Sequence, residues 1–133
     1  EGNTVTDFDD EEIARKLTIS TAVAAIEWKK SKINFLDTPG FNIFLHDTNL
    51  ALAAADAALV LVDGVAGVEV QTEKTWSFAD EFGLPRAIVI NRLDRERSSF
   101  ERALESVHQV FGRAAVPIQI PIGSERDFTG VID

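Results

Sequence analysis

Short apolar runs alternate with amphipathic stretches along this chain of 133 residues, and this alternation most constrains the fold. The runs 57–63 and 86–91 are apolar except at their ends, as in strands that are covered on both faces. The stretches 44–56 and 69–82 are amphipathic and predict helices, the second of which Gly83 ends. The order of strand, helix and strand predicts an α/β fold with a mostly parallel sheet between layers of helices.

The segments outside this centre extend the prediction. Residues 21–28 and 32–37 predict an antiparallel pair of strands, because only a short polar turn joins them. Residues 98–112 predict the strongest helix, since apolar residues recur at helical spacing. Ser98 and Glu101 have the spacing of a capping box at its start, Gly112 closes it, and 116–120 predicts a last strand.

The composition excludes several classes of protein. The formal net charge of −9 repels phosphate backbones, so we expect no direct nucleic-acid binding. Much of the acid lies in 7–12, which predicts a solvated helix start. Cysteine is absent and only His46 and His108 are present, so disulfides, thiolate sites and histidine cages are not expected. No apolar run approaches the roughly 18 residues that cross a bilayer, so we expect no membrane partner. The absence of cysteine fits the reducing cytoplasm, which is the expected location.

Three predicted strands end in a polar residue, namely Asp37, Asp63 and Asn91. Right-handed crossovers place the loops after parallel strands along one edge of the sheet. Ligands of such sheets bind at this edge, so the loops after these strands are the candidate site.

The first loop begins with Asp37-Thr38-Pro39-Gly40. A carboxylate at a strand end can hold magnesium, often through water. Pro39 fixes the backbone, and Gly40 has no Cβ, so its N–H can approach a phosphate oxygen. Together these residues would sense a terminal phosphate and its metal. An ordinary Pro-Gly turn explains the same four residues, and both interpretations stay open at this point.

The second loop is Asn91-Arg92-Leu93-Asp94. A carboxylate at Asp94 can accept two hydrogen bonds from the edge of guanine, a pair of donors that adenine does not offer. Asn91 would fix the loop and touch the base. The alternative is an Asx turn that starts the next connection.

The two loops follow strands of one predicted sheet, so one suits the phosphate end and the other the base end of a nucleotide, as in GTP-binding proteins. With this pattern the chain resembles the GTP-binding domain of the elongation factor G family. Residues 37–41, DTPGF, resemble the family's DTPGH, and 91–94, NRLD, resemble its NKMD. Further similar stretches are 15–20, which resembles the switch segment RGITI, 63–76, and 116–133, which resembles the lead into an inserted subdomain.

The resemblance implies a partial GTP-binding domain over 1–133, with about 116–133 leading into the inserted subdomain. It implies GTP or GDP and magnesium as cofactors and the ribosome as partner, in a GTP hydrolase acting in translocation. Thr18 and Asp37 would bind the metal. The implied nucleotide-binding residues are Asp37, Thr38, Pro39, Gly40, Phe41, Asn91, Arg92, Leu93 and Asp94.

Three positions depart from the family pattern. Phe41 stands where the family has the histidine that positions the attacking water, and phenylalanine forms no such hydrogen bond. Lys16 replaces a glycine, as in a divergent branch of the family, and Arg92 replaces a lysine whose stem lies along the base. Weak hydrolysis by a ribosome-associated switch is therefore an alternative, and a ribosomal protection protein shares the same motifs.

The sequence contains no GxxxxGK[ST] loop, which supplies amides and a lysine to the inner phosphates. We therefore expect the first strand and the phosphate loop of the family to precede Glu1, and the last guanine-contacting motif to follow Asp133. The chain alone would then bind GTP weakly or not at all and would not be active by itself, with a gap of one strand between 32–37 and 57–63.

Overall fold

The computed structural model describes residues 4–133, which divide into two compact units. The first unit holds the chain up to Ala58 together with Phe78–Pro85. The second unit holds Leu59–Ser77 and Arg86–Asp133. Each unit is described by itself below.

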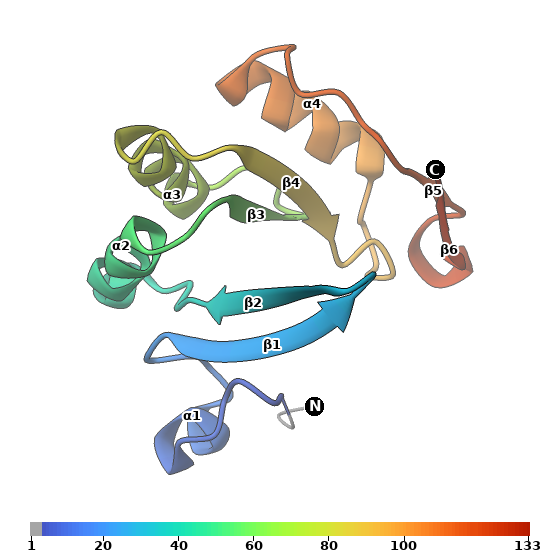
Figure 1. The fold of residues 1–133 in the computed structure, drawn as a ribbon. Helices are drawn as coiled ribbons and strands as arrows, with labels where there is room; N and C mark the ends of the chain where they lie inside the picture. Colours follow the sequence, from blue (N-terminus) through green and yellow to red (C-terminus); the bar gives the residue numbers. More distant parts are fainter. Residues whose placement is uncertain (1–3) are drawn as a thin grey trace. The chain divides into compact units, whose positions relative to one another are not determined.

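The first unit contains the predicted hairpin. Strand β1, Ala22–Trp28, pairs antiparallel with β2, Ser31–Asp37 (Figure 1). Lys29 and Lys30 form the two-residue loop, with φ of 47° and 69°. Such primed turns match the twist of the strands and need positive φ at both positions, so the antiparallel prediction is confirmed.

The helices of the first unit start and end differently from the prediction. The expected helix 44–56 begins as the 3₁₀ turn η1, Asn42–Phe44, and continues as α2, Leu45–Ala53. It ends three residues early because the N–H of Ala54 bonds back to the carbonyls of Ala51 and Leu52. A small core lies between α2 and the chain around residue 80, formed by Leu52, Ala58, Ala79, Phe78 and Leu84.

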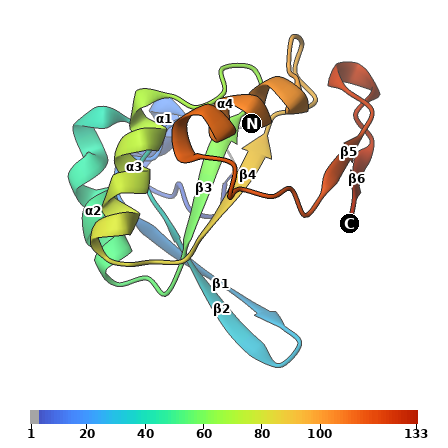
Figure 2. The same cartoon turned by 90° about the horizontal axis from the view of Figure 1, so that it is seen from above.

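The second unit contains a parallel pair of strands. Strand β3, Ala58–Asp63, lies beside β4, Arg86–Asn91, and their arrows point the same way in Figure 2. At the carboxyl ends, the N–H of Gly64 donates to the carbonyl of Asn91 at 2.8 Å. Helix α3, Val70–Glu81, connects the strands, as expected for a parallel crossover, and Gly83 with φ of 63° follows it.

The expectation that 57–63 is covered on both faces is wrong for the residues that the structure describes. Val60 and Val62 are buried, whereas Leu59 and Leu61 are 54% and 58% exposed. One face of β3 packs in the core of the second unit, and Leu59 and Leu61 on the other face are more than half exposed, so burial alternates with the period of the strand.

Helix α4, Phe100–Phe111, packs on β4 and begins one residue later than the capping pattern predicted. The N-cap is Ser99, whose hydroxyl accepts from the N–H of Arg102 at 3.2 Å. Ser98 does not cap the helix, because its hydroxyl donates to the carbonyl of Leu93 instead. The buried core of this unit is Val62, Ala103 and Val107, with Val68, Ile88, Ile90, Phe111 and Ala115 packed against it.

The predicted last strand 116–120 is also corrected. Strand β5 is Ile120–Ile122, and it pairs antiparallel with β6, Gly130–Ile132, which the pattern did not indicate. Residues 116–119 have no hydrogen-bonded strand partner within residues 4–133, whereas 120–122 have β6. Among residues 4–133 the hydrogen-bonded sheets are therefore three pairs, β1-β2, β3-β4 and β5-β6.

The strand pairing and the helix lengths concern two further expectations, a gap in the sheet and the absence of a membrane span. In the part of the chain that the structure describes, β2 pairs with β1 and β3 pairs with β4, and the gap of one strand between 32–37 and 57–63 stays a prediction. No helix within residues 4–133 is both long enough and apolar enough to traverse a lipid bilayer.

Candidate functional site

The loop after β2 is held by its buried proline. Pro39 is fully buried, and its carbonyl accepts a hydrogen bond from the hydroxyl of Thr48 in α2 at 2.9 Å. The bend is therefore fixed to the helix that follows it. Gly40 is exposed, and a Cβ built there meets no atom within 4 Å, so the space beside its Cα is open.

The two predicted metal ligands lie in the first unit, and both are hydrogen-bonded to the N-terminal segment. The hydroxyl of Thr6 donates to Oδ2 of Asp37 at 2.5 Å, and the hydroxyl of Thr18 donates to Oδ1 of Asp7 at 2.8 Å. Carboxylate and hydroxyl oxygens are the donor types that magnesium prefers, so this donor set fits the ion. Within residues 4–133 no cluster of three or more His, Asp or Glu side chains could hold a metal.

Glu12 is a residue of this region that the sequence interpretation missed. It was expected in a solvated helix start, and α1, Asp10–Arg15, does begin there, but Glu12 is only 3% exposed. Its Oε1 accepts the N–H groups of Ile19 and Ser20 at 2.9 and 3.1 Å, immediately after Thr18. These bonds, first of all the one from Ile19, lower the pKa of Glu12. The spacing of Asp9 and Glu12, a capping box, was the signal that could have identified it.

Phe41 occupies an exposed position beside this bend. Its side chain is 57% exposed and forms no cap at the start of η1, although its carbonyl accepts the N–H of Phe44 at 2.9 Å. His46 lies exposed in the first turn of α2. An aromatic ring in this place is free to meet an apolar surface but supplies neither a donor nor an acceptor.

The loop after β4 lies in the second unit and is held by local hydrogen bonds. The side-chain oxygen of Asn91 accepts the N–H of Arg92 at 2.8 Å, and Arg92 has φ of 62°. Leu93 is buried, and its carbonyl accepts both the hydroxyl of Ser98 at 2.7 Å and the N–H of Glu125 at 3.0 Å. Asp94 is exposed. The backbone of the loop is thus anchored while Asp94 is exposed to solvent.

Asp63, the polar residue at the end of β3, is tied to the same loop. Its Oδ2 accepts from Nη1 of Arg92 at 2.8 Å, and its Oδ1 accepts the N–H groups of Val65 and Ala66. The hydrogen bond from Arg92 is the first cause of a lowered pKa of Asp63. The guanidinium of Arg92 is therefore held at the end of β3, although the side chain stays half exposed.

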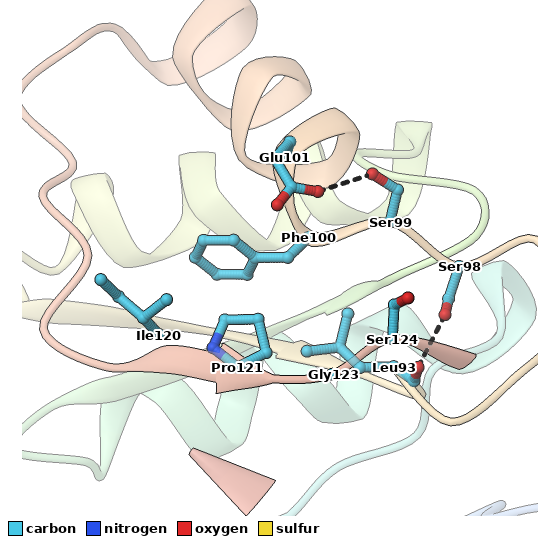
Figure 3. A pocket seen from close by; sticks show the side chains of 9 residues that line it. All are labelled: Leu93, Ser98, Ser99, Phe100, Glu101, Ile120, Pro121, Gly123 and Ser124. Carbon is cyan, nitrogen blue, oxygen red and sulfur yellow. Dashed lines mark hydrogen bonds between the residues drawn. The ribbon is translucent and has the colours of Figure 1, made fainter. Parts of the chain in front are cut away.

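A small cavity of about 90 Å³ adjoins this loop (Figure 3). In Figure 3 the ring of Phe100 lies above Pro121, with Leu93 and Ser98 on one side of the cavity. Pockets for drug-sized ligands have volumes of about 300–1,000 Å³, so this cavity is too small for a nucleotide. It marks the place where the loop after β4 packs against residues 120–124.

The two candidate loops, 37–41 and 91–94, each follow a strand and each combine an anchored backbone with exposed polar groups. The family model of the elongation factor Tu GTP binding domain matches residues 1–129. The chain therefore belongs to the family of this GTP-binding domain, and the resemblance to elongation factor G is confirmed at family level.

Individual proteins of known sequence are also similar to this chain, among them elongation factor G and related factors. Elongation factor G of Granulibacter bethesdensis is 42% identical over 133 residues, which is 100% of this chain and 19% of that protein. The mitochondrial ribosome-releasing factor 2 of Culex quinquefasciatus is 44% identical over 132 residues, 99% of this chain and 18% of that protein. An elongation factor G-like protein of Thermotoga maritima is 38% identical over 127 residues, 96% of this chain and 19% of that protein.

A solved structure confirms the fold class. The crystal structure of a protein from Thermus thermophilus matches with a TM-score of 0.91 and 36% identity, covering 99% of this chain and 20% of that protein. The α/β fold predicted from the alternation of strands and helices is thus confirmed. The chain spans about one fifth of the length of the relatives it matches.

Proposed function

We propose that this chain is the nucleotide-binding part of a translational GTPase of the elongation factor G type, which binds GTP with magnesium and acts on the ribosome in translocation. The observation that carries the proposal is the pair of anchored strand-end loops, 37–41 and 91–94, in a chain of the GTP-binding domain family. We assign 1–133 to a partial GTP-binding domain, with about 116–133 leading into an inserted subdomain. The protein would act in the cytoplasm, without contacting nucleic acid through this acidic piece.

The proposed roles follow from the chemistry of each side chain. Asp37 and Thr18 would hold magnesium, once each leaves its present hydrogen-bond partner. Gly40 would direct its N–H to the terminal phosphate, because nothing obstructs its backbone. Asn91 and Asp94 would hold and read guanine. When bound, magnesium neutralises charge on the phosphates, while these residues orient the nucleotide.

Phe41 favours a second candidate function. Its exposed ring offers no hydrogen bond to an attacking water. The parent protein would then be a guanine-nucleotide switch on the ribosome that hydrolyses GTP weakly. A ribosomal protection protein, which shares both loops, is a related alternative that differs in the domains beyond this chain.

Ribosome-stimulated GTP turnover of the full-length protein separates the two candidates. The first predicts fast turnover by the wild type. The second predicts slow turnover that Phe41→His increases, with Phe44→His as a control for adding an imidazole nearby. Turnover that is fast in the wild type and unchanged by Phe41→His would exclude the switch. Absence of any GTP binding by the full-length wild type would overturn both.

A further inference from the structure

The segment 123–128 carries an unusual backbone that faces the loop after β4. Gly123 has φ of 78°, and a Cβ there would lie 2.0 Å from the carbonyl oxygen of Asp127. Only glycine therefore fits at this position. Glu125, two residues later, has φ of 51°, which is uncommon for a residue with a side chain. A short turn with two left-handed residues is thus built at this contact, where a strained backbone commonly serves a function.

Glu125 bonds to the loop after β4 through both its backbone and its side chain. Its N–H donates to the carbonyl of Leu93 at 3.0 Å, and its Oε1 accepts the N–H of Arg97 at 2.9 Å. These two bonds bracket Asp94, which lies one residue after Leu93 and three before Arg97. One residue from a distant part of the sequence therefore holds both sides of the segment that carries the exposed carboxylate.

The bracketed segment needs such support. Arg92 and Arg97 have φ of 62° and 67°, so left-handed non-glycine residues stand on both sides of Asp94. The carbonyl of Arg97 also accepts from the guanidinium of Arg102, and Ser98 bonds to Leu93 within the loop. Gly64 and Asp63 bond to Asn91 and Arg92 at the start of this segment, and Glu125 adds the two bonds from outside 91–102 that lie on either side of Asp94. Figure 3 shows Leu93 and Ser98 beside Ser124, the neighbour of Glu125.

We infer that Glu125 is a positioning residue for base recognition: it fixes the backbone on both sides of Asp94 so that the carboxylate keeps one orientation toward a nucleobase. This inference rests on the proposed function of Asp94 as the guanine reader. A carboxylate on a mobile loop loses conformational entropy when it binds, whereas one that is held in advance does not. Glu125 itself need not touch the nucleotide.

The test compares Glu125→Ala and Glu125→Gln with Glu96→Ala in the full-length protein. Glu96 is an exposed carboxylate in the same loop. Two quantities are measured: the rate of hydrogen exchange of the Arg97 amide in the protein without nucleotide, and the dissociation rate of GDP. Loss of a hydrogen bond to a charged group predicts that Glu125→Ala raises both rates about three- to tenfold. Glu125→Gln keeps an acceptor oxygen, so it should raise both rates less than Glu125→Ala does. Glu96→Ala should leave both rates unchanged.

The outcomes distinguish this inference from the function on which it rests. Glu125→Ala could leave the exchange rate of the Arg97 amide or the dissociation rate of GDP unchanged, while Asp94→Ala accelerates GDP release. The positioning role of Glu125 would then be wrong, and the assignment of Asp94 as the guanine reader would be retained. If the wild type binds GDP no better than ADP, the proposed function fails. An equal acceleration of Arg97 exchange in Glu96→Ala would also contradict the inference. The loss of a negative charge near the loop would then explain the effect without the contact of Glu125.

Discussion

Asp63 and Arg92 join the ends of two neighbouring strands through an ion pair of 2.8 Å between Oδ2 and Nη1. The second oxygen of Asp63 accepts two backbone N–H groups of the turn after β3. The pair thus connects that turn to the loop that carries Asp94. Arg92 replaces the lysine of the family pattern, and its guanidinium forms this ion pair with Asp63. A guanidinium offers several donors in one plane.

This pair predicts a defined dependence on pH. The pKa of Asp63 lies below its ordinary value of 3.8, chiefly because of the bond from Arg92. The stabilisation is therefore complete above pH 3.8 and is lost as the pH falls through the lowered pKa. Arg92→Ala should return the pKa of Asp63 toward 3.8, as measured by NMR titration of the carboxyl carbon. The cost in stability should stay near or below about 1 kcal/mol, because the arginine is half exposed.

Arg95→Ala is the matched control, since Arg95 is an exposed arginine of the same loop. An unchanged pKa of Asp63 in Arg92→Ala, or an equal change in Arg95→Ala, would contradict the account.

Glu12 should control the order of the segment around Thr18. Glu12→Ala removes the acceptor of the Ile19 and Ser20 N–H groups, so these amides should exchange with solvent about fivefold faster or more. The pKa of Glu12 lies below 4.5, so in the wild type this protection should be present above pH 4.5 and decline as the pH falls through the lowered pKa. Hydrogen exchange measured by NMR against pH tests both statements.

Glu11→Ala serves as the control for this prediction. Glu11 is exposed and pairs with Arg15 within α1. Its loss should change the exchange of Ile19 and Ser20 little. Equal acceleration in both variants would show that the charge of the acidic run, not the buried carboxylate, orders the segment.

Helix α4 provides a test of the core of the second unit. Val107 is 1% exposed and packs with Val62 and Ala103, whereas Val110 on the same helix is 45% exposed. Val107→Ala should lower the free energy of unfolding by about 2 kcal/mol, from lost burial and the cavity left behind. Val110→Ala should cost at most about 0.5 kcal/mol, since it lies at the surface. Urea denaturation of both variants measures the difference. Equal losses in the free energy of unfolding would contradict the assignment of Val107 to the core.

Local patterns in the sequence predicted most of the elements. The run 86–91 coincides with β4, and the short polar turn correctly indicated the antiparallel pairing of β1 and β2. These two predictions are correct because a strand and a short hairpin turn each depend on residues that are close together in the sequence. The capping pattern at Ser98 failed because the serine bonds to Leu93 five residues earlier, a contact that spacing within the helix does not contain.

The parts that sequence could not predict depend on contacts between distant residues. The exposure of Leu59 and Leu61 depends on which segments cover β3, and an apolar run looks the same when one face is open. Strand β6 needs β5 as its partner, and three residues give no periodic signal. The contacts of Glu125 with Leu93 and Arg97 join positions 28 or more residues apart. The chemical roles of 37–41 and 91–94 stay predictions.

Base selectivity of the full-length protein tests the central claim most directly. Xanthine carries a carbonyl where guanine carries an amine, so the carboxylate of Asp94 favours guanine and an amide favours xanthine. Calorimetry with GDP and XDP should show that the wild type prefers GDP, and that Asp94→Asn weakens GDP binding and strengthens XDP binding, each by about tenfold or more. Asp127→Asn, an exposed aspartate elsewhere in the second unit, should leave the preference for GDP in place. A preference for GDP that survives Asp94→Asn would contradict the assignment of this loop as the guanine reader.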